Sequence, residues 1–258
     1  MKSKKILTII ILLLAVMLFS VGMIVKEADE RRQDISDFEK LEDLITEPES
    51  EEPITDNENT DELASTQSLR NLTPLFEQNA DCLGWICIPD TSVNYPVMHT
   101  PQEPEKYLRR NFEGEYSVSG VPFLEGTSLL NDTNLIIYGH NMKNGTMFSD
   151  VTKYREKDFC GKHPYIEFET KDGLKCYDVF AVVCVKKTDD WYKFRYAENE
   201  EQHRDKITEI KKRSLYDTGI VPGYGQQLIT LSTCYGNARD DRIIVIGAEQ
   251  EENSRLAS

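Results

Sequence analysis

The sequence predicts a mainly β domain, a closed or nearly closed β-barrel that carries one inserted helix. From about residue 69 onward, at least seven short apolar runs alternate with turn residues, which is typical of such barrels. Among these runs one segment, NEEQHRDKITEIKKRSLY at residues 199–216, places Ile207, Ile210 and Leu215 near helical spacing with charges elsewhere. We therefore expect an amphipathic helix between the strands.

The N-terminus predicts a membrane anchor. Residues 6–25, ILTIIILLLAVMLFSVGMIV, contain no charge and are long enough as a helix to cross a hydrocarbon core of about 30 Å. By the positive-inside rule, residues 1–5 form a cytoplasmic basic tail and the chain beyond the anchor is extracellular. A cleaved signal peptide is the alternative, but FSVGMIV offers a poor cleavage site. The charges that set this orientation are Lys2, Lys4 and Lys5 before the anchor and Glu27, Asp29 and Glu30 after it.

Residues 26–68 are predicted to form an acidic extracellular stalk before a catalytic domain at 69–258. Residues 26–62 carry 16 Asp or Glu against 4 Lys or Arg, so most of the net charge of −15 is local. Such a segment buries little apolar surface and is expected to be extended. No basic stripe is present in the sequence, which excludes nucleic acid as a partner. A short helix is possible in the first part of the stalk. The apolar positions at roughly helical spacing are Ile35, Phe38, Leu41, Leu44 and Ile45.

The predicted strands follow in chain order. The alternating runs on either side of Asp172 and Gly173 predict a β-hairpin, because Asp-Gly is a strong hairpin turn signal. The runs are GWICIPD (84–90), VNYPVM (93–98), NLIIYGH (134–140), YIEFETKDGLKCYDVFAVVCV (165–185), QQLITLST (226–233) and DRIIVIGA (241–248).

Six cysteines outside the membrane raise the question of disulfides, but their spacing supports no particular pairing. Cys82 and Cys87 are in or beside the first strand and Cys160 is in a polar loop. Cys176 and Cys184 are an even number of residues apart on one strand, so they are expected on one face. Buried free thiols are the default for these five. No CxxC pair is matched by a second one, so a structural zinc site is not expected.

Residues with catalytic potential stand at three strand ends. Cys234 ends one apolar run and Arg242 opens the next, while His140 directly follows an earlier strand. Cys234 is either a small buried hydrophobe or a nucleophile, and His140 either a structural histidine or its acid and base. A nearby imidazole increases the thiolate fraction above the small share that a free thiol has at pH 7. An arginine offers fixed donors to an oxyanion.

The motifs NLIIYGHNMKNGTMFSDVTKY, LITLSTC and RIIVIG resemble those of the sortases, the membrane-anchored cysteine transpeptidases of Gram-positive bacteria. The resemblance is closest to class B and runs from about residue 72 to residue 249, including the helix before the last two strands. It implies a closed eight-stranded sortase-type β-barrel with N-terminal helices.

This resemblance implies roles for individual residues. Cys234 matches the nucleophile, His140 the catalytic histidine and Arg242 the arginine at the start of the last strand. Arg239, in the preceding turn, is the alternative oxyanion donor. Five residues fall where class B members line the substrate groove: Leu108, Tyr138, Thr188, Tyr192 and Ser232.

The function implied is cleavage of a Thr-containing C-terminal sorting signal of secreted proteins through a Cys234 thioester. The acyl group then passes to a peptidoglycan precursor amine at the cell membrane, and no metal or organic cofactor is required. Three alternatives remain: a membrane-tethered cysteine peptidase that hydrolyses, a pilus-type polymerising sortase, and a non-enzymatic binding module with an unreactive Cys234.

Two positions depart from the family pattern. Pro104, in PQEPEKYL, stands near a position where relatives often carry Asn, and Glu125 stands where Asp is common. Pro104 removes a side-chain donor that could recognise an Asn at the first position of the substrate motif. The sequence therefore favours a Pro-x-Thr-Gly type of signal over an Asn-Pro-x-Thr type.

Overall fold

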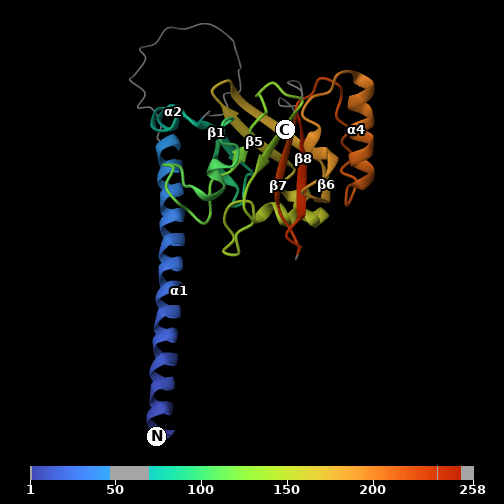
Figure 1. The fold of residues 1–258 in the computed structure, drawn as a ribbon. Coiled ribbons are helices and arrows are strands. Elements are labelled where there is room, and N and C mark those ends of the chain that lie inside the picture. Colours follow the sequence, from blue (N-terminus) through green and yellow to red (C-terminus); the bar gives the residue numbers. More distant parts are fainter. Residues whose placement is uncertain (1, 47–69, 237, 251–258) are drawn as a thin grey trace, which may run out of the picture.

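Eight strands close into a barrel in the computed structural model, which describes residues 2–46, 70–236 and 238–250 (Figure 1). Around the barrel the strands follow the order β1-β2-β3-β4-β7-β8-β6-β5. Among the strands in the described residues, β2 with β3 and β4 with β7 pair in parallel, and the other neighbours pair antiparallel. The predicted barrel is confirmed, with the eight strands that the resemblance implied. Their bounds are β1 Cys82–Cys87, β2 Asn94–Met98, β3 Phe123–Leu124, β4 Asn134–Tyr138, β5 Tyr165–Thr170, β6 Gly173–Lys186, β7 Leu228–Cys234 and β8 Asp241–Glu249.

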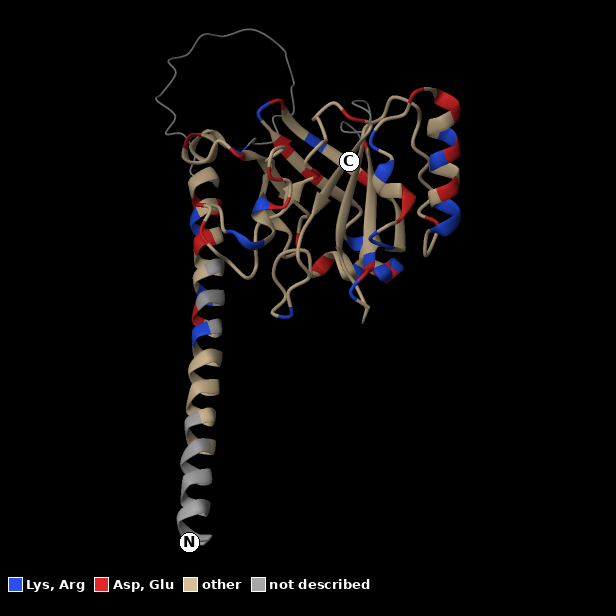
Figure 2. Cartoon of the chain, viewed as in Figure 1, with Lys and Arg blue, Asp and Glu red and all other residues tan. Residues whose placement is uncertain are grey.

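The predicted amphipathic helix forms α4, Glu200–Arg213, between β6 and β7. The side chain of Asn199 accepts a hydrogen bond from the Gln202 N–H and caps its first turn. Ile207 and Ile210 are buried in a cluster with side chains of β6 and β8, whereas charged residues of both signs cover the outer face (Figure 2). The other helices are α1 Lys2–Thr46, α2 Thr73–Gln78, η1 Lys106–Arg109, η2 Asp150–Arg155, α3 Lys157–Lys162 and η3 Asp190–Lys193.

Strands β5 and β6 form the predicted hairpin, with Gly173 at its turn. Gly173 has φ of 112°, a conformation that favours glycine. Further along β6, a β-bulge between Val179 and Ala181 shifts the pairing with β8. Because a bulge inverts the alternation of side chains, Cys176 and Cys184 lie on opposite faces, so their predicted common face is wrong.

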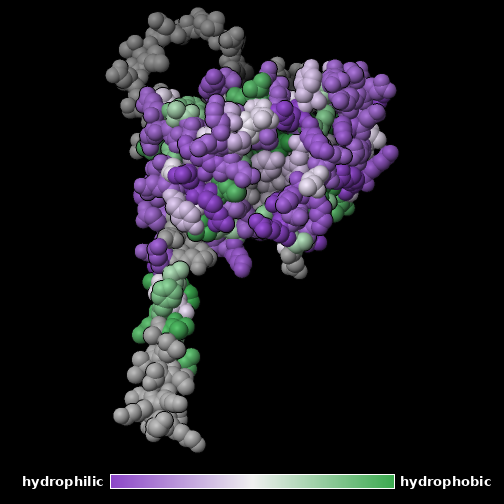
Figure 3. Space-filling view, in the orientation of Figure 1, coloured by the Kyte–Doolittle hydropathy of each residue, from purple (hydrophilic) through white to green (hydrophobic). Residues whose placement is uncertain are grey.

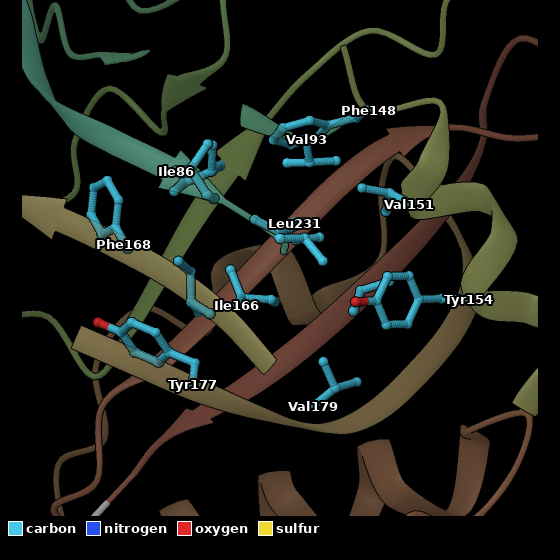
Figure 4. Close-up of a cluster of buried hydrophobic side chains, with 14 of the residues drawn as sticks. Ile86, Val93, Phe148, Val151, Tyr154, Ile166, Phe168, Tyr177, Val179 and Leu231 are labelled. Carbon is cyan, nitrogen blue, oxygen red and sulfur yellow. The ribbon is translucent and has the colours of Figure 1, made fainter. Parts of the chain in front are cut away.

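Apolar side chains fill the barrel interior (Figure 4). Ile86 from β1, Ile166 from β5 and Leu231 from β7 are fully buried there and meet Phe148 from the loop after β4. Two further clusters lie outside the barrel wall, one between the N-terminal helices and β1 and β2, the other beneath α4. The wall is therefore packed on both faces around much of its circumference.

Helix α1 runs without interruption from Lys2 to Thr46. Phe38, Leu41 and Ile45 are buried against barrel residues that include Tyr95 of β2. The helix that the sequence allowed in the first part of the stalk is present and extends through residues 26–46, because an apolar stripe at helical spacing finds a complementary barrel surface. Residues 47–68, the rest of the predicted stalk, lie outside the described residues.

The predicted anchor falls on the N-terminal half of α1. In the part of the chain that the structure describes, no helix meets the length and apolarity needed to cross a bilayer. The side chains of residues 2–12 and of residue 15 lie outside the described part. These side chains include eight of the 20 positions of the predicted span at 6–25 and most of the predicted basic tail at 1–5.

All six cysteines are free thiols, but Cys184 is exposed, so the prediction that it is buried is wrong. Cys160, expected in a polar loop, instead lies within the short helix α3. It is buried because it packs in the same apolar cluster as the side chains of the barrel interior. Burial raises the pKa of the Cys82 thiol to about 12 and that of Cys87 to about 11. Partial desolvation also raises the pKa of Cys184, although its side chain is exposed to solvent. Thiols with raised pKa values are poor nucleophiles at neutral pH.

Candidate active site

The strand topology brings a cysteine, a histidine and an arginine to one rim of the barrel. Cys234 is the last residue of β7, and the antiparallel register places it directly opposite Arg242 of β8. On the other side of β7, the parallel strand β4 pairs Tyr138 with Ser232. His140 follows two residues after Tyr138, so it reaches the same rim. The three predicted catalytic residues therefore lie together.

Gly139 fixes the direction in which the chain enters His140. Its N–H donates to the Ser232 carbonyl at 3.1 Å, and its carbonyl accepts from the Thr233 hydroxyl at 2.8 Å. A Cβ atom at this position would lie 2.5 Å from the ring of Phe148. Only glycine fits between the end of β7 and this ring, so the position before the histidine is sterically determined.

His140 is held through its ring as well as its backbone. Nε2 lies 2.9 Å from the Leu108 carbonyl oxygen, and it carries the ring proton because a carbonyl only accepts. The other ring nitrogen is then the basic one. Burial lowers the pKa of His140, the charges of Arg109 and Arg242 lower it further, and the bond to Leu108 opposes them. A neutral imidazole is thus favoured at neutral pH.

The Arg242 guanidinium is fixed by its own turn. Its Nη1 donates to the carbonyls of Arg239 at 2.9 Å and Asp241 at 2.8 Å. Arg239 lines the same groove as Arg242, so the alternative oxyanion donor is also close in space. The two arginines differ in that Arg242 belongs to the strand paired with Cys234 and Arg239 belongs to the turn.

Asn141 is a contact that the sequence reasoning missed. Its Nδ2 donates to the carbonyl of Cys234 at 3.0 Å and so ties the histidine segment to the nucleophile position. Cys234 itself is exposed to solvent. The only sequence signal for Asn141 was its place directly after His140, within the motif that carries the family resemblance.

A groove with a volume of about 500 Å³ runs across this rim. Four of the five predicted substrate residues line it, together with all three predicted catalytic residues. Thr188 is not among the lining residues, and its neighbour Lys187 is. Pro104 and Glu125, the two departures from the family pattern, also border the groove. The remaining lining residues are Glu105, Val121, Phe123, Gly126, Gly139, Thr233 and Arg239.

One wall of the groove is aromatic. The rings of Tyr138 and Tyr192 stack with centroids 6.0 Å apart, and the Tyr192 hydroxyl lies 2.8 Å from the Ser232 hydroxyl. Burial raises the pKa of Tyr192 to about 12 and also raises the pKa of Tyr138. Both hydroxyls are therefore neutral, and the wall combines apolar faces with hydrogen-bonding groups.

Glu125 makes contacts that turn it away from the catalytic residues. Its Oε2 accepts from the Thr127 N–H at 3.0 Å and from the Thr127 hydroxyl at 2.8 Å. Arg195 lies 3.6 Å from the same oxygen. The acidic side chain thus closes its own turn at the groove edge, and its charge is balanced by a cation outside the groove.

An eight-stranded barrel whose rim carries a cysteine, a histidine and an arginine in one groove defines a class of cysteine transpeptidases. The Sortase domain family matches residues 86–250, and the chain belongs to the sortase family. It is 36% identical to Sortase B of Listeria monocytogenes over 169 residues, covering 63% of this chain and 66% of that protein, just under two thirds.

Two comparisons extend over more of the chain. Sortase B of Staphylococcus aureus is 28% identical over 241 residues, which cover 91% of each protein. The solved Staphylococcus aureus sortase B–substrate complex superposes with a TM-score of 0.72 at 26% identity, covering 86% of this chain and 99% of that one. The predicted class B resemblance is confirmed.

Proposed function

We propose that this protein is a class B transpeptidase that cleaves a Thr-containing sorting signal of secreted proteins and joins them to a peptidoglycan amine. One observation carries the proposal. The nucleophile candidate Cys234 stands opposite Arg242 in the β7–β8 register, and His140 ends at the same groove. A thiol, a neutral imidazole and a fixed guanidinium are the groups that acyl transfer through a thioester requires.

The first half of the reaction forms the acyl-enzyme. His140 takes the Cys234 proton at its free ring nitrogen as the sulfur attacks the carbonyl of the threonine, and the carbonyl oxygen becomes an oxyanion. Arg242 donates hydrogen bonds to this oxyanion. When the intermediate collapses, the C–N bond breaks and His140 returns the proton to the leaving amine. The products are a Cys234 thioester and a free amine.

In the second half an amine attacks the thioester. His140 accepts a proton from the attacking amine, the new amide forms and the proton returns to the Cys234 sulfur. Water in place of the amine would give hydrolysis, which is the reaction of the alternative peptidase. An acceptor that is another protein subunit, as in pilus polymerisation, would use the same residues, so the acceptor distinguishes these possibilities.

The sorting signal that we propose is of the Pro-x-Thr-Gly type. Pro104 borders the groove and packs against Gly126, where a Cβ atom would lie 2.5 Å from the proline ring. This corner of the groove therefore offers an apolar ring instead of a side-chain donor for Asn. The aromatic wall of Tyr138 and Tyr192 is suited to hold an extended peptide.

We also propose that residues 6–25 anchor the protein in the cell membrane, with residues 1–5 cytoplasmic and the catalytic domain outside. The described side chains of this part of α1 are exposed and apolar, among them Leu18, Phe19 and Ile24 (Figure 3). Apolar side chains exposed along a helix call for a nonpolar partner. An anchor places the enzyme beside both substrates, the secreted protein and the lipid-linked precursor.

A peptide assay tests the proposal. Peptides of the Pro-x-Thr-Gly and Asn-Pro-x-Thr types are incubated with the full chain, with and without a glycine-based amine, and mass spectrometry reads cleavage, ligation and the Cys234 thioester. We expect ligation with the first type and none with Cys234→Ala, while His140→Ala loses at least about 100-fold in rate. Hydrolysis without ligation would support the peptidase instead. No thioester with any Thr-containing peptide would exclude both.

A further inference from the structure

A chain of direct contacts connects the N-terminal helix to the candidate active site. It begins at Phe38 of α1, whose ring meets the ring of Tyr95 on β2 edge-on, with centroids 5.1 Å apart at 80°. Phe38 is 9% exposed and Tyr95 is 7% exposed, so this contact is closed to solvent. The helix thus presses on a side chain of the barrel wall.

Tyr95 holds the loop that follows His140. Its hydroxyl accepts a hydrogen bond from the Met147 N–H at 3.0 Å. Met147 has φ of 57°, a left-handed conformation that costs free energy in any residue other than glycine. It is also 1% exposed. A strained, buried residue keeps its conformation only where its surroundings fix it, and the Tyr95 hydroxyl is one of these fixed partners.

The same loop contacts the backbone of His140 and Asn141, next to Cys234. Directly after Met147, the Phe148 N–H donates to the His140 carbonyl at 2.8 Å. Met147 also forms an isolated antiparallel bridge with Asn141, whose side chain binds the Cys234 carbonyl. The backbone of His140 and of the residue that follows it is therefore set by a loop that Tyr95 holds.

We propose that Tyr95 is a positioning residue for His140, and that α1 orients Tyr95 through Phe38. The inference rests on the proposed transpeptidase function, because it concerns the rate at which His140 transfers protons. The helix beside the barrel then does more than connect the domain to the membrane. Its last turns fix the histidine from a surface that lies outside the substrate groove.

The test is Tyr95→Phe in the full chain, which removes the hydroxyl and keeps the ring that Phe38 contacts. We expect kcat to fall on the order of three- to tenfold, as for loss of one buried hydrogen bond, with KM for the sorting peptide unchanged. In Tyr95→Phe, the apparent pKa that His140 contributes to the pH–rate profile should move toward higher pH. A loosened imidazole gains solvent, while Arg109 and Arg242, the cations that face it, stay in place.

Two matched variants separate positioning from stability. Tyr177→Phe removes another buried hydroxyl, bonded to Gln227 at the opposite end of the barrel, and should leave kcat and the pH profile unchanged. Leu41→Ala removes buried surface from the same helix face as Phe38→Ala but leaves the ring on Tyr95. We expect both helix variants to lower Tm and only Phe38→Ala to lower kcat.

Three outcomes are decisive. A wild-type chain that forms no thioester would remove the proposed function and the inference together. A wild-type chain that ligates while Tyr95→Phe keeps its kcat and pH profile would overturn the inference alone. Equal kcat in Phe38→Ala and Leu41→Ala, each measured well below its Tm, would limit the positioning role to Tyr95 and overturn the role of α1.

Discussion

At the scale of single residues, the arginine is the proposed catalytic group whose identity can be tested most sharply. Arg242 is held by two carbonyls of its own turn, so its planar fork is preorganised toward the groove. Arg242→Lys keeps the charge but loses the fork, and we expect kcat/KM to fall by about 100-fold or more, as for loss of an oxyanion donor. Arg239→Lys is the control and should stay within a few-fold of wild type. A larger loss of kcat/KM in Arg239→Lys than in Arg242→Lys would assign the oxyanion role to Arg239.

A second residue, His203, should make stability depend on pH. It is 2% exposed on α4 with its ring 5.8 Å from that of Tyr224, and its Nε2 has no hydrogen-bond partner among the described residues. Burial lowers its pKa below the value of about 6.5 in the unfolded chain. The unfolded state therefore binds the proton first, and the contribution of His203 to stability is complete above pH 6.5 and lost as pH falls toward its folded pKa.

His203→Gln stays neutral at every pH and tests this sign. We expect urea unfolding of the variant between pH 6.5 and pH 5 to lose less stability than the wild type, by up to about 1.4 kcal/mol per pH unit. His140, whose pKa is lowered in the same direction, continues to contribute in both proteins. Parallel stability curves for the two proteins would mean that His203 accepts its proton in the folded state without cost.

The sequence was informative about residues whose position follows from strand ends. Cys234, His140 and Arg242 each begin or follow an apolar run, and neighbouring strand ends meet at one rim. Contacts through the backbone had no such signal. The carbonyl of Leu108 on His140 and the positive φ of Met147 depend on tertiary packing, and the residue type does not encode them.

At the scale of elements, the structure changes what a truncation should do. A deletion of residues 1–65, which treats the stalk as a spacer, also removes Phe38, Leu41 and Ile45 from the barrel surface. Each such buried side chain contributes about 1.5–3 kcal/mol before the cost of ordering the helix is subtracted. A deletion of residues 1–31 keeps all three.

We expect both truncated proteins to fold, and Δ1–65 to be about 3 kcal/mol less stable than Δ1–31. In thermal unfolding this corresponds to a Tm that is lower by about 10 °C for a domain of this size. Lys40→Ala within Δ1–31 changes an exposed position of the same helix and serves as the control. Equal Tm values for the two deletions would mean that the helix does not pack on the barrel in solution.

Helices and strands with a strong local sequence signal were predictable, whereas irregularities within them and their packing on other elements were not. The Asp172-Gly173 turn and the helical spacing of Ile207 and Ile210 are short-range features, so the hairpin and α4 were expected where they occur. Leu215, the third apolar residue of that spacing, lies beyond the end of α4. The bulge in β6 near Val179 adds one residue to a long strand without a turn signal, and it reversed the expected face of Cys184. The packing of α1 was missed because its acidic composition outweighed a sparse apolar stripe.

At the scale of the whole molecule, the candidate active site lies at the end of the barrel toward which the N-terminal part of α1 extends. The end of β7 and the start of β8, which carry Cys234 and Arg242, lie at the lower end of the barrel, the end toward which the N-terminal part of α1 extends (Figure 1). A second hollow of about 520 Å³, bordered by Tyr196 and Tyr224, opens at the opposite end. If residues 6–25 lie in a membrane, the groove would face that bilayer, as the proposed lipid-linked acceptor requires.

This orientation can be tested with the thiols of the protein itself. Cys184 and Cys234 are exposed and the other four cysteines are buried, so Cys184→Ser leaves one accessible thiol in the folded chain. If the positive-inside rule holds for Lys2, Lys4 and Lys5, Cys234 lies outside the cell. A membrane-impermeant maleimide should then label this variant in intact cells, with Cys184→Ser/Cys234→Ser as the unlabelled control.

Deletion of residues 1–25 from the same variant tests the anchor separately from the topology. The full chain should stay in the membrane pellet after a carbonate wash, because about 20 apolar residues in a helix remain in the hydrocarbon core, and the deletion should move the protein to the soluble fraction. Labelling that requires cell lysis would reverse the proposed topology. A full chain released by carbonate would contradict the membrane anchor, and the exposed apolar side chains of this part of α1, among them Leu18 and Phe19, would then need another partner to cover them.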